Sequence, residues 1–156
     1  MKELSYQLDL VWTGDKGEGT LSYNAYERNY VVHSKDKGEL QMSSDEHFRG
    51  DKSKYNPEEM LLMAVSSCHM LWYLHLCSDA GIVVKKYTDK PEAKLVLDKT
   101  GSGRMEQFLL KPCVTITRET DREKAISLHD GANKKCFIAN TLNVKIQHVV
   151  DIQVIE

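Results

Sequence analysis

The stretch NPEEMLLMAVSSCHMLWYLHL, residues 56–76, decides the fold because it predicts one long helix near the middle of the chain. Asn56 is a favourable N-cap, a proline occupies the first helical position, and Glu59 completes a capping box. The apolar pattern continues to about Ala80, where Gly81 is a favourable helix stop. A helix of about 24 residues is about 36 Å long.

This predicted helix is apolar on nearly all of its faces. One small sheet covers only one side of a helix, so the other side needs a second partner, and a homodimer supplies it most simply. The stretch also contains two histidines, one cysteine and two serines. We therefore interpret it as a core helix and not as a membrane span.

The composition is that of an ordinary globular domain. The chain has 156 residues, of which 41% are hydrophobic and 28% charged. Its net charge is −2 and its Lys and Arg residues are scattered, so we expect no nucleic-acid or membrane partner. The N-terminal segment lacks the continuous apolar stretch of a signal peptide, and we expect a cytoplasmic protein without a disulfide framework.

Alternating and helical patterns on either side of the central helix predict the remaining elements. Strands are expected at residues 4–12, 21–33, 40–42, 90–99, 104–119 and 142–154, and a second helix at 121–141, capped by Thr120 or Asp121. The glycine-rich turn at residues 13–20 lacks the spacing of a phosphate loop. The element order predicts a single α+β domain over residues 1–156 with an antiparallel or mixed sheet.

Two of the four cysteines lie where predicted helices face the core. Cys68 has small neighbours in the central helix, and Cys136 continues an apolar stripe in the second helix. Helices with small residues can approach closely, so these two thiols can meet. Cys77 points away from Cys68, and we interpret Cys77 and Cys113 as packing residues. The grouping of His69, His75 and Cys77 lacks the ligand set of a zinc site, so no metal is expected.

Two segments carry a family resemblance. NPEEMLLMAVSSCHM, residues 56–70, resembles the N-P-E-[EQ]-L…A-x-[AS]-x-x-[AS]-C signature of the OsmC/Ohr family of thiol-dependent peroxidases. HDGANKKCFIAN, residues 129–140, resembles the second cysteine motif of the same family. The segments at residues 12–32, 48–59 and 68–77 look like an OsmC-like branch and not the Ohr branch. Phe137 departs from the pattern, because many members have proline after the second cysteine.

The resemblance implies a fold and a reaction. It implies an intertwined homodimer with curved sheets and two packed helices. Cys68 would be the peroxidatic cysteine, attacking an organic hydroperoxide, or hydrogen peroxide less well, and becoming a sulfenic acid. Cys136 would resolve it to a disulfide, which an external dithiol protein of the lipoyl or thioredoxin type would reduce. No bound cofactor is implied, and the role would be defence against oxidative stress.

The resemblance also implies a cation that stabilises the thiolate. Burial disfavours a thiolate, and family members oppose this with an arginine held by a glutamate. Glu58 matches the glutamate, but ten residues of straight helix separate it from Cys68 by about 15 Å. Glu58 would therefore act from the partner chain or through a bend, or it is only a helix-start acid. Arg28 and Arg49 are equal candidates for the arginine, and Lys16 is a third.

Other readings of the site follow from the same residues. A Cys–His pair for acyl transfer would need His75 or His129, and we interpret the histidines as core or interface residues. Trp72 is a candidate wall of an apolar cleft. One alternative function is a hotdog-like thioesterase that uses Glu58 or Glu59. Another is a non-catalytic ligand-binding or stress-response dimer of the same fold.

Overall fold

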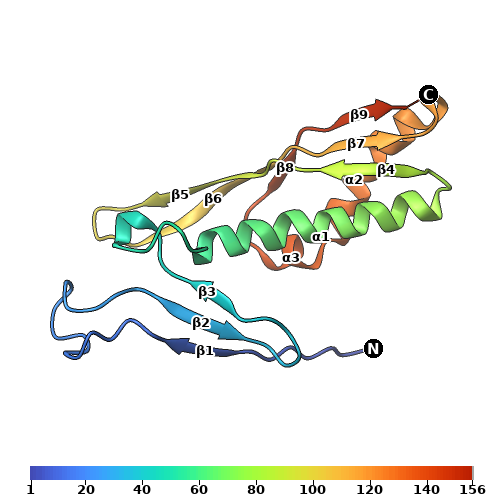
Figure 1. The fold of residues 1–156 in the computed structure, drawn as a ribbon. Helices are drawn as coiled ribbons and strands as arrows, with labels where there is room; N and C mark the ends of the chain where they lie inside the picture. The colour runs from blue at the N-terminus through green and yellow to red at the C-terminus, as the bar shows by residue number, and fades with distance from the viewer. Residues whose placement is uncertain (156) are drawn as a thin grey trace. The chain divides into compact units, whose positions relative to one another are not determined.

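The structure of the protein is a computed structural model that describes residues 1–155. The chain forms two compact units, Met1–Met60 and Leu61–Glu156. Figure 1 labels the helices and strands of both units. The predicted single domain over residues 1–156 stays a prediction, and its last residue lies outside the described part.

The first unit is built on one antiparallel sheet of order β1-β2-β3. Its strands are β1 (Asp9–Trp12), β2 (Tyr30–His33) and β3 (Leu40–Met42). The short third strand is confirmed, whereas the first two strands are shorter than predicted. Residues 1–8 have no regular structure, and the chain before β2 forms turns.

A side chain explains why the second strand begins late. The Arg28 guanidinium donates to the backbone carbonyls of Tyr26 at 2.6 Å and Tyr23 at 2.7 Å. Carbonyl groups that accept hydrogen bonds from a side chain do not need a hydrogen-bond partner in a neighbouring strand. The tyrosine-rich composition of residues 21–29 predicts a strand, but the local hydrogen bonds hold this segment in turns.

The central helix α1 (Pro57–Asp79) has the predicted start and end. The Asn56 side chain accepts from the Glu59 amide at 2.8 Å, and the Glu59 carboxylate accepts from the Asn56 amide at 3.1 Å. At the other end Gly81 has φ 71°, and the Ile82 amide donates to the Cys77 carbonyl at 2.9 Å. The capping box and the left-handed glycine stop are both confirmed.

The second unit contains two mixed sheets, which confirms the predicted α+β class with mixed pairing. Their strands are β4 (Val84–Thr88), β5 (Glu92–Leu97), β6 (Gly103–Leu110), β7 (Cys113–Ile116), β8 (Ile146–His148) and β9 (Asp151–Val154). The sheet orders are β4-β7-β9 and β5-β6-β8. In each sheet the last strand is parallel to its neighbour and the other pair is antiparallel.

Two predicted strands of this unit are each divided between the two sheets. The run 104–119 forms β6 and β7, and the run 142–154 forms β8 and β9. Pro112, which has no amide hydrogen for a ladder, lies between β6 and β7. The Val149 amide donates to the Leu110 carbonyl at 2.9 Å, so both segments cross between the sheets together.

The predicted second helix is also divided. The structure has α2 (Arg122–Lys135) and α3 (Phe137–Thr141), with Cys136 between them at φ −65° and ψ 112°. The expectation that Cys136 lies inside a helix is therefore wrong. Asp121 is the N-cap residue of α2, as one of the two predictions has it, but its side chain makes no capping hydrogen bond, because Asp121 ends a short 3-10 turn and its carboxylate accepts from Arg118 at 2.8 Å.

One face of α1 packs on both sheets of the second unit (Figure 1). Val65, towards the start of the helix, joins the core over β6 and β8, whereas Tyr73 and Cys77 join the core over β7 and β9. Other positions of α1 are exposed, including Met63 at 44% and Leu71 at 62%. By length and composition alone α1 could cross a membrane, a test that core helices of globular proteins also pass.

The capping box makes a stability prediction. Replacing Asn56 by Ala removes the acceptor for the Glu59 amide, and we expect the free energy of unfolding to fall by about 1 kcal/mol. Urea unfolding followed by circular dichroism measures this change. Asn56→Asp keeps an acceptor at the same place and should stay close to the unsubstituted protein. An Asn56→Ala protein as stable as the Asp variant would contradict the role of the cap.

Candidate functional site

The second unit brings Cys68 and Cys136 together. Cys68 is half-buried in α1, and Cys136 is 1% exposed at the junction of α2 and α3. Both are free thiols. Burial and the neighbouring Cys68 side chain raise the pKa of the Cys136 thiol to about 11. Two thiols 68 positions apart in the sequence thus form a pair, with Cys136 protonated at neutral pH.

The break between α2 and α3 orients Cys136. Because its backbone is extended, Cys136 occupies the N-cap position of α3. Its sulfur accepts a hydrogen bond from the Ala139 amide at 3.4 Å. In most helix caps a side-chain oxygen accepts this hydrogen bond. The sulfur is therefore held by the start of α3 while it faces Cys68.

An aromatic residue follows each of the two cysteines at a short distance in the sequence. Trp72 follows Cys68 by one turn of α1, and its ring meets that of Phe137, the residue after Cys136, edge to face at 5.5 Å. The Lys135 ammonium lies 5.2 Å from the Trp72 ring. Phe137 is 67% exposed. The expected role of Trp72 as a cleft wall stays a prediction.

Two histidines form a buried pair, and one of them, His69, directly follows Cys68 in α1. His69 Nε2 and His129 Nδ1 lie 2.9 Å apart, and the residues are 1% and 0% exposed. Tyr73 stacks on the His129 ring at 3.8 Å. Burial, aided by neighbouring histidines, lowers the pKa of His69 to about 4 and that of His129 to about 3. Both imidazoles are neutral at pH 7, and their interpretation as core residues is confirmed.

The remaining histidines differ from this pair. The His75 side chain is 61% exposed and lies 3.4 Å from the Asp79 carboxylate, so it is a surface residue of α1. The ring of His148 lies 5.7 Å from that of His69, and its Nε2 lies 3.3 Å from the Asp130 carboxylate. Among residues 1–155, no group of three or more His, Cys, Asp or Glu side chains is arranged to hold a metal ion.

The other two cysteines are not alike. Cys77 is 1% exposed in the core over β7 and β9, which confirms its interpretation as a packing residue. Cys113 is half-buried, and its sulfur lies 3.3 Å from the Asp151 carboxylate. Burial and this carboxylate raise the pKa of the Cys113 thiol. Cys113 is therefore a partly exposed thiol and not the core residue that the sequence predicts.

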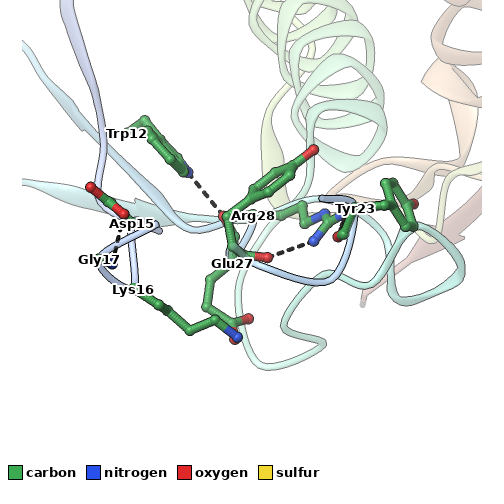
Figure 2. Close-up of polar contacts among 8 residues, drawn as sticks. Trp12, Asp15, Lys16, Gly17, Tyr23, Glu27 and Arg28 are labelled. Atoms are coloured by element: carbon green, nitrogen blue, oxygen red, sulfur yellow. Dashed lines mark hydrogen bonds and ion pairs between the residues drawn. The ribbon is translucent and has the colours of Figure 1, made fainter. Parts of the chain in front are cut away.

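The candidate cations belong to the first unit. Figure 2 shows Arg28 among the residues of the turn before β2. Its guanidinium lies 4.2 Å from the Tyr23 ring centre and 4.1 Å from that of Tyr26, in addition to its two carbonyl contacts. The Lys16 ammonium pairs with the Glu27 carboxylate at 3.1 Å (Figure 2). The charge of Lys16 is thus already balanced within the turn.

Arg49 and Glu58 also lie in the first unit. Arg49 has φ 66°, ends a short 3-10 turn, and places its guanidinium 5.9 Å from the Tyr23 ring centre. Arg28 and Arg49 therefore share one aromatic neighbour. Glu58 lies in the first turn of α1, and its charge adds to burial in raising the pKa of Tyr30. The roles of Arg28, Arg49 and Glu58 stay predictions.

The model of the OsmC-like protein family matches residues 50–150. An OsmC-like protein of unknown function from Vibrio cholerae superimposes with a TM-score of 0.82 at 24% identity, covering 96% of this chain and 99% of that one. No curated protein matches the chain.

Two further solved structures share the fold and have functional descriptions. An organic hydroperoxide resistance protein OsmC from Legionella pneumophila matches with a TM-score of 0.68 at 15% identity, covering 99% of this chain and 100% of that one. A putative organic hydroperoxide resistance protein from Vibrio cholerae, with captopril bound in one active site, matches with a TM-score of 0.64 at 20% identity, covering 96% and 93%.

The fold, with its two mixed sheets and long central helix, is that of the OsmC-like proteins. This chain belongs to the OsmC-like protein family.

The buried histidine pair predicts a loss of stability in acid. An unfolded histidine gains its proton near pH 6.5, whereas His69 and His129 do so only near pH 4 and 3 in the folded protein. Between these values the unfolded state binds more protons. The free energy of unfolding should therefore decrease as the pH falls below 6.5, by up to about 1.4 kcal/mol per pH unit for each imidazole.

Urea unfolding at pH 7, 6 and 5 measures this slope. Replacing both residues in one protein, His69→Gln with His129→Asn, should remove their share of it. His75→Gln changes an exposed histidine of the same helix and should leave the slope unchanged. If the double variant loses stability between pH 7 and 5 as steeply as the unsubstituted protein, the account of the pair is wrong.

Proposed function

We propose that the protein is a thiol-dependent peroxidase that reduces organic hydroperoxides, and hydrogen peroxide less well, in defence against oxidative stress. The observation that carries this proposal is the pairing of the Cys68 and Cys136 thiols at the junction of α1, α2 and α3. The two organic hydroperoxide resistance proteins with the same fold support it. Family membership adds to both observations.

The half-buried Cys68 is the peroxidatic residue and the buried Cys136 is the resolving residue. The Cys68 thiolate attacks one peroxide oxygen, the O–O bond breaks, and the other oxygen leaves as an alcohol after taking a proton. The Cys68 sulfenic acid and the Cys136 thiol then form a disulfide and release water. Cys136 is held as a thiol because its pKa is raised to about 11, so it gives up its proton in this second step.

A dithiol reductant completes the cycle. A dithiol protein of the lipoyl or thioredoxin type gives two electrons to the disulfide by thiol exchange and becomes a disulfide itself. No bound cofactor or metal takes part in these steps. We place the protein in the cytoplasm, whose reducing conditions would return Cys68 and Cys136 to thiols.

The active form in this proposal is a homodimer. Buried hydrophobic residues in the first unit are few, among them Val31 and Met42, whereas Leu8 and Leu10 stay more than half exposed. Met63 and Leu71 on α1 are also exposed to solvent. A second copy would bury these apolar side chains. It would also bring Glu58 and either Arg28 or Arg49 to the Cys68 of its partner, where the arginine would stabilise the thiolate.

The thioesterase alternative has less support. It needs a free carboxylate near the start of α1, but the Glu59 carboxylate accepts from the Asn56 amide and serves the cap. Glu58 is the remaining candidate. Neither a thioesterase nor a ligand-binding dimer gives a chemical reason for the buried thiol beside Cys68. Cysteine variants separate these functions.

Cysteine variants test the peroxidase proposal. Cys68→Ser should reduce turnover of cumene hydroperoxide, with dihydrolipoamide as reductant, to the uncatalysed background, because an alcohol cannot replace the thiolate. Cys136→Ser, treated with one equivalent of cumene hydroperoxide before any reductant is added, should keep a sulfenic acid at Cys68 that dimedone traps. Cys113→Ser changes a partly exposed thiol outside the pair and should retain activity. Full activity in Cys68→Ser would exclude this mechanism and favour a carboxylate enzyme.

Arginine variants identify the cation. Lysine keeps the charge but not the planar fork of arginine. The arginine that serves Cys68 should lose about 100-fold in kcat/KM on replacement by lysine, as expected for a lost donor to a reacting anion. Arg28→Lys and Arg49→Lys are compared with the unsubstituted protein, and Lys16→Gln tests the third candidate in the same way. If none of the three variants differs from the unsubstituted protein, the thiolate is stabilised by another group.

A further inference from the structure

The hydrogen bond between His69 and His129 is a second link between the segments that carry the thiols. His69 follows Cys68 directly in α1, and His129 lies in α2 two turns before Cys136. His69 Nε2 and His129 Nδ1 lie 2.9 Å apart, and both side chains are fully buried. A buried hydrogen bond in such surroundings has a defined geometry, because either group alone would be costly to bury.

The chemistry of imidazole makes this bond specific. A neutral imidazole has one donor and one acceptor nitrogen, so one ring must donate while the other accepts. His69 uses its distal nitrogen, Nε2, and His129 uses its proximal nitrogen, Nδ1. The other nitrogens, His69 Nδ1 and His129 Nε2, are buried without a protein partner in the described part of the chain. The bond between the rings is therefore the polar contact that these two side chains make.

The surrounding packing limits movement of the two helices. Tyr73, one turn after His69, stacks on the His129 ring with the planes 17° apart. The helices also meet at Gly131, where an added Cβ would lie 3.1 Å from the Leu76 side chain. His69 adjoins Cys68 in α1, and His129 and Gly131, both in α2, precede Cys136 by at most two turns. A change at the histidines would therefore alter the approach of Cys136 to Cys68.

We propose that His69 and His129 are positioning residues that, through their mutual hydrogen bond, hold α1 and α2 where the Cys68 thiol meets the Cys136 thiol. They do not touch the reacting atoms. The bond sets how readily the two cysteines form their disulfide. This inference rests on the thiol pair of the proposed function but not on the peroxide step.

Equilibration with glutathione tests the positioning role without any peroxide. The two protein thiols and one oxidised glutathione give the protein disulfide and two reduced glutathiones, and the equilibrium constant measures how well the thiols are held together. Disulfide content is measured by alkylation and mass spectrometry at pH 7. His69→Leu and His129→Leu, which cannot form the bond, should each lower this constant at least 10-fold.

Two double variants of identical composition separate the hydrogen bond from its polar surroundings. In His69→Gln with His129→Asn, the two side-chain amides reach the places of His69 Nε2 and His129 Nδ1. This variant should restore the equilibrium constant to within about 3-fold of the original value, a free-energy difference of about 0.7 kcal/mol. In His69→Asn with His129→Gln, the same amides are at the wrong lengths, and the constant should stay at least 10-fold low. His75→Gln is the exposed control.

The outcomes are decisive even if the leucine variants do not fold. Equal constants for the two amide pairs, with circular dichroism showing both folded, would overturn the positioning role. So would a failure of the original protein to form the Cys68–Cys136 disulfide. A protein that forms the disulfide with the predicted order of constants but does not consume hydroperoxide would retain this inference and refute the peroxidase proposal.

Discussion

The contact between the thiols of Cys68 and Cys136 is the constraint on which the chemistry of this protein depends. It needs α1 to pass the end of α2, and it needs the chain to leave the helical conformation at Cys136 itself. The long capped helix satisfies the first condition, because both sheets of the second unit hold one of its faces. The extended backbone at Cys136 satisfies the second and turns the sulfur towards Cys68.

Features governed by local chemistry could be predicted from the sequence. The start of α1 follows from the spacing of Asn56 and Glu59, and its end from a glycine that accepts a positive φ. Features that depend on distant contacts could not. The apolar stripe of the second helix runs through Cys136 without a breaker, so the break there is visible only in the structure. The strand β4 has no alternating pattern in the sequence, because a bulge between Val84 and Lys86 interrupts it.

The candidate site was predictable to a similar extent. The cysteine motifs indicate the thiol pair, and the structure brings both residues together. The link between His69 and His129 has no sequence signal, because sixty positions separate them and each looks like an ordinary core residue. The placement of Arg28 in a turn depends on the carbonyls of Tyr23 and Tyr26, which no periodicity reveals. Side chains that satisfy distant or irregular backbone groups are therefore what sequence patterns miss.

The central claim is that a hydroperoxide oxidises Cys68 and that Cys136 resolves it. The most direct measurement treats the reduced protein with one equivalent of cumene hydroperoxide, blocks the remaining thiols, and maps the disulfides by peptide mass spectrometry. The account predicts one intramolecular disulfide between Cys68 and Cys136, with Cys77 and Cys113 still free. Free thiols at both Cys68 and Cys136 after this treatment would contradict it.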